Sequence, residues 1–155
     1  MIRNLAGRIA LVTLLLVVAA TPWAQAPLIG RLSFPTSATG RPQDAFDRGV
    51  LYLHNFEYDD AIIAFPEAQT LSPGFAMAYW GEAMTYNHPV WMEQDAVAAR
   101  AALSRLAPTP ELRRAKAPTA REQAWLSAVE TLYAEDRPGG GSAEAQKQIN
   151  QPTGT

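Results

Sequence analysis

The feature that most constrains this chain is a helical pattern that repeats with a period of 34 residues. Three pairs of helix positions stand at that distance: Ala45 and Tyr79, Gly49 and Ala83, and Tyr52 and Tyr86. Apolar residues at helical spacing predict five helices, over 46–56, 58–71, 75–86, 91–106 and 119–133. No stretch alternates with a period of two residues for long enough to predict a strand. Because short loops join these helices, we expect antiparallel pairs in an all-α fold.

A known repeat family shares the spacing found over residues 42–75. The motif residues are Gly49-x-x-Tyr52, Ala61-x-x-x-Phe65, Ala68 and Pro73. This spacing resembles the tetratricopeptide repeat (TPR) family, in which small residues lie where the two helices of a unit cross closely. The stretch 76–83 is also similar to a subgroup of exported bacterial TPR-like proteins. The resemblance implies about five helices, in two and a half repeats, forming a right-handed array over 43–134.

Two local signals indicate where a predicted helix bends and where another begins. Pro66 falls inside the second helix, where a proline removes a hydrogen bond and costs about 3 kcal/mol. We therefore expect a kink or a split near Ile63–Pro66. Thr119, followed three residues later by Glu122, predicts a capping box at the start of the fifth helix.

The N-terminus has the three-part pattern of a secretory signal peptide. Arg3 and Arg8 precede an apolar run over 9–20, and the small residues Ala24 and Ala26 indicate a cleavage site. We expect residues 1–26 to be a signal peptide, with an uncleaved membrane anchor as the alternative. Residues 27–42 are predicted to be a flexible lead-in and residues 135–155 a disordered Gly-rich tail. This organisation favours a bacterial periplasmic or secreted protein.

Composition and motifs exclude several classes of function. The 155 residues include no cysteine, which rules out disulfides and thiol chemistry. A net charge of −2 leaves no basic surplus for nucleic-acid binding. No nucleotide-binding or hydrolase motif occurs, so we expect neither catalysis nor a cofactor. The TPR resemblance implies instead an exported scaffold that binds a peptide or a partner subunit.

The resemblance further implies a binding groove on the inner wall of the helical array. Its residues would be Phe46, Val50, Leu53, His54, Met77, Trp80, Met84, Asn87 and His88. Aromatic and methionine side chains with a few hydrogen-bonding groups suit a peptide or a helix of a protein partner. An aromatic stripe at helical spacing is also typical of a hydrophobic core. Trp80 and Met84 are therefore expected either to line the groove or to lie in the core.

The two histidines, His54 and His88, stand 34 residues apart and carry the alternative function. Imidazoles on neighbouring helices could share a metal ion with a carboxylate, so metal or small-ligand binding is that alternative. Capping of the helix C-termini is the simpler interpretation, and we assign no metal ligand. Because the array ends after half a unit, self-association through the fifth helix or an incomplete repeat fragment is also an open interpretation.

Overall fold

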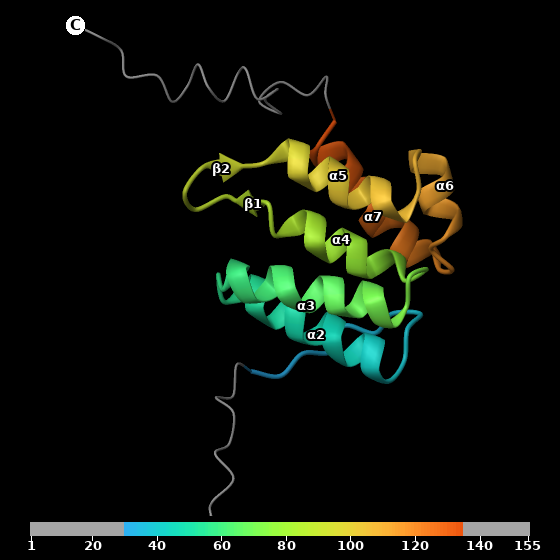
Figure 1. Ribbon diagram of the computed structural model, residues 1–155, viewed down its shortest axis with the longest axis horizontal. Coiled ribbons are helices and arrows are strands. Elements are labelled where there is room, and N and C mark those ends of the chain that lie inside the picture. Colours follow the sequence, from blue (N-terminus) through green and yellow to red (C-terminus); the bar gives the residue numbers. More distant parts are fainter. Residues whose placement is uncertain (1–29, 135–155) are drawn as a thin grey trace, which may run out of the picture.

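The computed structural model describes residues 30–134, which form an all-α fold with one short hairpin (Figure 1). The helices are α2 (Arg41–His54), α3 (Tyr58–Leu71), α4 (Ala76–Met84), α5 (Ala96–Leu106), α6 (Pro110–Ala115) and α7 (Ala120–Leu132). The hairpin pairs β1 (Asn87–His88) with β2 (Glu93–Gln94) in antiparallel fashion. None of the helices within residues 30–134 has the length and the apolar character that a membrane span requires. The predicted signal peptide and tail lie outside the described residues.

Three helices meet on a single aromatic ring. Helices α2, α3, α4 and α5 lie side by side in chain order, and α7 packs against α4 (Figure 1). Phe65 of α3 lies between Gly49 of α2 and Gly81 of α4. A Cβ atom at Gly49 would lie 2.7 Å from the ring, and one at Gly81 would lie within 2.6 Å of three ring atoms. Only glycine therefore lets α2 and α4 approach Phe65 this closely.

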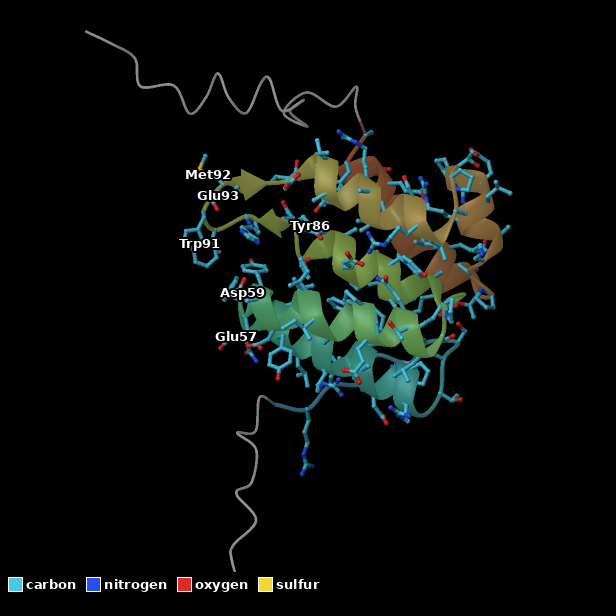
Figure 2. The ribbon with its side chains drawn as sticks, in the orientation of Figure 1. Glu57, Asp59, Tyr86, Trp91, Met92 and Glu93 are labelled. Atoms are coloured by element: carbon cyan, nitrogen blue, oxygen red, sulfur yellow. The ribbon has the colours of Figure 1, made fainter. Side chains whose placement is uncertain are left out.

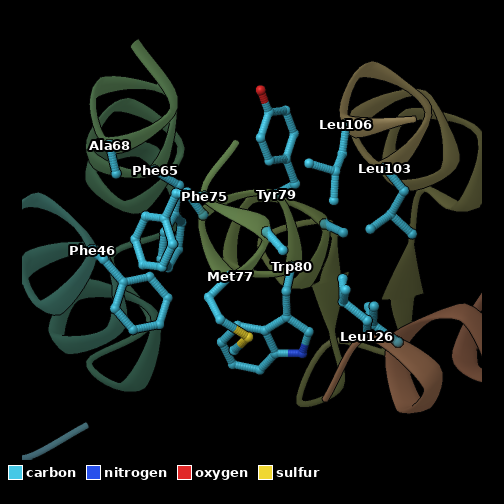
Figure 3. Close-up of a cluster of buried hydrophobic side chains, with 14 of the residues drawn as sticks. Phe46, Phe65, Ala68, Phe75, Met77, Tyr79, Trp80, Leu103, Leu106 and Leu126 are labelled. Carbon is cyan, nitrogen blue, oxygen red and sulfur yellow. The ribbon is translucent and has the colours of Figure 1, made fainter. Parts of the chain in front are cut away.

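The hydrophobic core runs from α2 through α4 to α7 and combines aromatic with small side chains (Figure 3). Phe46, Phe65 and Met77 are fully buried, and Leu126 brings α7 into the same cluster. Tyr133, just after α7, donates a hydrogen bond to the carbonyl of Ala83 at 2.8 Å. Burial, with a smaller contribution from Asp95, raises the pKa of the Tyr133 hydroxyl, so this group stays a donor.

The buried carboxylate of Glu82 has hydrogen-bond and ion-pair partners on two neighbouring helices. Glu82 of α4 accepts a hydrogen bond from Gln69 Nε2 at 2.5 Å and pairs with Arg105 of α5. Within residues 30–134 every buried side-chain nitrogen or oxygen has a hydrogen-bond partner. Glu82 therefore ties α3, α4 and α5 together.

Helix α3 runs unbroken from Tyr58 to Leu71 although Pro66 lies inside it. Of the predicted kink or split, the split is therefore wrong, and the kink stays a prediction. Ala61, Phe65 and Ala68 of this helix are buried against its neighbours. Most helical stability in proteins comes from such packing, which here outweighs the hydrogen bond lost at the proline.

The region after α4 also differs from the prediction. The fourth helix, expected over 91–106, begins only at Ala96, because the Asp95 side chain caps it by accepting from the Ala98 amide at 2.9 Å. The residues before Asp95 fold back as the hairpin instead. Helix α6, which the sequence did not predict, starts at a Thr109 cap with Pro110 in its first turn.

The lead-in expected to be flexible over 27–42 is packed against the helices in its described part, and its last two residues belong to α2. The Phe34 ring holds the lead-in against the helices. Its ring stacks on Trp80 at 5.9 Å and lies 5.7 Å from Trp125 and 5.4 Å from Phe46, centroid to centroid. The lead-in therefore covers the aromatic wall formed by α2, α4 and α7. Its sequence has no periodicity, so this packing could not be predicted from it.

The backbone of the lead-in is held by α7. Arg121 lies over the Phe34 ring at 4.6 Å and donates to the Pro35 carbonyl at 2.6 Å. The Ser37 amide donates to the Glu122 carboxylate at 2.8 Å. The Thr119 hydroxyl oxygen accepts from the Glu122 amide at 3.2 Å, which confirms the predicted cap at the start of this helix. Burial alone would raise the pKa of Glu122, but the hydrogen bonds from Ser37 and Thr119 lower it overall.

Candidate partner-docking site

The inner-wall residues predicted to line a groove divide into two groups. Phe46, Val50, Met77 and Trp80 are buried, none of them more than 4% exposed. They cannot form an open groove, and for Trp80 the core interpretation is the right one. The physical reason is that Phe34 and Trp125 cover this wall, with Trp125 lying 5.2 Å from Trp80. The remaining members, Leu53, His54, Met84, Asn87 and His88, are half-buried or exposed.

Both histidines donate to backbone carbonyls near a helix C-terminus. His54 Nδ1 lies 2.8 Å from the Val50 oxygen, and His88 Nε2 lies 2.9 Å from the Thr85 oxygen. Since a carbonyl only accepts, each of these ring nitrogens carries a proton. In the described part of the chain no three His, Cys, Asp or Glu side chains converge as a metal site. The capping interpretation therefore accounts for the observed contacts of both residues.

The hairpin places a set of apolar side chains in solvent. Its register pairs Asn87 with Gln94 and His88 with Glu93. The Asp95 amide closes it by donating to the Tyr86 carbonyl at 2.9 Å. The four-residue connection carries three exposed apolar side chains: Val90 is 65% exposed, Trp91 55% and Met92 85%.

The turn between α2 and α3 joins this hairpin to form one surface. Phe56 is 53% exposed, and its ring lies 5.9 Å from the Trp91 ring. Tyr58, the first residue of α3, lies 6.1 Å from Trp91 and 3.9 Å from the His88 ring. We call Phe56, Tyr58, Val90, Trp91 and Met92 the apolar tip. Two segments far apart in the sequence thus build a single exposed patch, of the kind that marks interaction sites.

Backbone geometry at the tip is unfavourable for the residues that occupy it. Phe56 has φ 63° and Met92 has φ 56°, the two non-glycine residues with positive φ in the part of the chain described. At Phe56, the Glu57 amide donates to the Tyr52 carbonyl and the Phe56 amide to the Leu53 carbonyl, a Schellman helix end. Glycine or asparagine normally fills such a position, and a bulky residue costs about 1–2 kcal/mol.

Carboxylates surround the apolar tip. Figure 2 shows Glu57 and Asp59 at the same end of the molecule as Trp91, Met92 and Glu93. Asp60 lies beside Asp59 in the first turn of α3, where the helix dipole stabilises negative charge. Within residues 30–134 neither a lysine nor an arginine pairs with any of these four acids. Glu93 makes a long contact with a histidine, in which its carboxylate oxygen lies 3.8 Å from His88 Nδ1.

Comparison of the chain with models of known protein families, with curated proteins and with solved structures finds no match.

The sequence pattern did not predict the hairpin, because residues 91–106 were expected to form one helix, whereas α5 begins only at Ala96. A signal was present in Val90, Trp91 and Met92, three apolar residues in a row directly after a proline. Such a run without a helical partner is typical of an exposed functional loop.

Proposed function

We propose that this protein is an exported, TPR-like scaffold without catalytic activity that docks a protein partner through the apolar tip. The observation that carries the proposal is the pair of bulky apolar residues, Phe56 and Met92, held exposed at left-handed backbone positions. Neither is buried in return for the strain, since Phe56 stays 53% exposed and Met92 85%. Residues held at a strained backbone position without a gain in stability occur mainly at functional sites.

The TPR-like part of the proposal is supported by the helix packing. Helices α2 and α3 are joined by a short turn and pack along each other, as the two helices of one unit would. Gly49 and Phe65, two positions that carry the family resemblance, lie in close contact between these helices. The proposal of export rests on the pattern of residues 1–26 alone.

The test is site-specific photo-crosslinking in the cell that exports the protein. Benzoylphenylalanine replaces Trp91 in one variant and Leu112 in a control. Leu112 is 52% exposed and lies on α6, remote from the tip (Figure 1). We expect a discrete protein adduct from position 91 that is absent from position 112. Equal adduct patterns from both positions, or none from position 91, would contradict the proposal.

Met92→Asn separates docking from folding. Asparagine tolerates a left-handed backbone, so the variant should gain up to about 1 kcal/mol of stability. Its adduct yield at position 91 should nevertheless fall, because Met92 is part of the contact surface. A docking loss accompanied by a raised melting temperature cannot be attributed to unfolding.

A further inference from the structure

We infer that the partner segment received by the apolar tip is cationic as well as apolar: a peptide stretch in which lysine or arginine stands beside aliphatic residues. This inference rests on the proposed function and names the chemistry of the partner. The apolar tip provides contact area, and the charges around it decide which apolar segment fits.

The first step is the distribution of charge along the chain. Between Arg48 and Arg100 there is neither a lysine nor an arginine, whereas seven acids fall in that stretch. Two of these acids are neutralised by arginines outside it: Glu67 pairs with Arg48 at 2.5 Å, and Glu82 pairs with Arg105. Asp95 is occupied in capping α5. The negative charge that is left is concentrated at the tip.

The four remaining acids are Glu57, Asp59, Asp60 and Glu93, and all four are exposed. Like charges crowded on one surface repel each other, and a cation arriving there relieves that repulsion. Lysine and arginine also stack on exposed aromatic faces, and the Trp91 ring is more than half exposed. Apolar contact and charge therefore favour the same kind of side chain, a long aliphatic stem with a cationic end.

Two other occupants fit less well. An anionic bilayer surface is repelled by the four carboxylates. A second copy of the chain would offer α6, where Arg114 and Lys116 are exposed beside Glu111. Arg113 in that helix is buried and paired with Glu130 at 2.7 Å, so α6 brings a net charge of only about +1 against four acids.

The experiment is isothermal titration calorimetry of the full chain with an amphipathic lysine/leucine peptide of about 12 residues. Two matched peptides carry glutamine or glutamate in place of lysine. We expect the lysine peptide to bind at least about tenfold more tightly than the glutamine peptide, and its affinity to fall with added salt. The glutamate peptide should not bind.

Two pairs of variants place the binding on the protein. Trp91→Ala should weaken lysine-peptide binding about thirtyfold, whereas the control Leu112→Ala should change it less than about twofold. Glu57→Gln combined with Asp59→Asn should weaken it about tenfold. The control with the same change of net charge is Asp44→Asn combined with Glu111→Gln, two exposed acids away from the tip, and it should have little effect.

The outcomes distinguish failure of the inference from failure of the proposed function. If the glutamine peptide binds as well as the lysine peptide and Trp91→Ala weakens both, the tip docks a partner but the cationic class is wrong. If no variant at the tip changes binding, or if no peptide binds, both are overturned. Sedimentation of the full chain and flotation with anionic vesicles complete the test. Concentration-dependent association lost in both Trp91→Ala and Leu112→Ala, or vesicle binding lost in Trp91→Ala, would assign the tip to those occupants instead.

Discussion

Gly81→Ala should destabilise the protein although alanine is the better helix former. A Cβ atom at position 81 would lie within 2.6 Å of three atoms of the Phe65 ring, closer than side-chain contacts allow. The ring has nowhere to move, because it is fully buried and Gly49 approaches it from α2. Overpacking of a tight core costs about 1–3 kcal/mol, and the helix propensity of alanine returns about 1 kcal/mol. For a clash this severe we expect a net loss of about 2 kcal/mol.

Urea unfolding followed by circular dichroism measures this loss, with Gly74→Ala as the matched control. Nothing lies within 4 Å of a Cβ atom at Gly74, so the control should be neutral or gain up to about 1 kcal/mol. Phe65→Leu makes room for the new methyl group. The double variant with Gly81→Ala should therefore be more stable than the sum of the two single losses predicts. A Gly81→Ala variant as stable as the parent protein would refute the packing described for Phe65.

Three further predictions concern the lead-in and α3. Phe34→Ala should cost about 2 kcal/mol and shift the tryptophan emission to the red, since Trp80 and Trp125 lose their cover; an unchanged emission maximum would argue against that contact. The pKa of Glu122 in the folded protein is lower than the ordinary glutamate pKa of 4.5, so its ionised carboxylate stabilises the fold at any pH above 4.5. This stabilisation is lost as the pH falls below 4.5 through the folded-state pKa. The difference in urea stability between the parent protein and Glu122→Gln should accordingly narrow from about pH 6 to about pH 3, and a difference independent of pH would contradict the assignment. Pro66→Arg should raise the melting temperature by restoring a hydrogen bond inside α3, and no change would mean that the proline costs nothing there.

The helices that carry the 34-residue pattern could be predicted from the sequence, because their signals are local. Phe65 and Ala68 occur at helical spacing, and Thr119 with Glu122 forms a cap that depends on four consecutive residues. Gly49 was recognised as a point of close approach through the family resemblance. The matching role of Gly81 was missed, although it depends on the same Phe65 ring.

The candidate site could not be predicted, because it depends on contacts between distant segments. Trp91 and Phe56 meet only when the hairpin folds over the turn between α2 and α3. Phe34 lies in a segment without periodicity, and only the assembled wall around Trp80 gives it a place to pack. The predicted groove failed for that reason: Phe34 of the lead-in packs on Phe46 and Trp80, two of the residues that were expected to line it.

The most direct test of the account maps where a cationic, apolar segment binds. The full chain, labelled with ¹⁵N, is titrated with the lysine/leucine peptide and followed by NMR. The account predicts that the largest shifts occur at the Trp91 indole and at the amides of residues 56–60 and 90–93, while Leu112 and the α6 amides stay unchanged. Shifts centred on α6 or spread evenly over the molecule would contradict it.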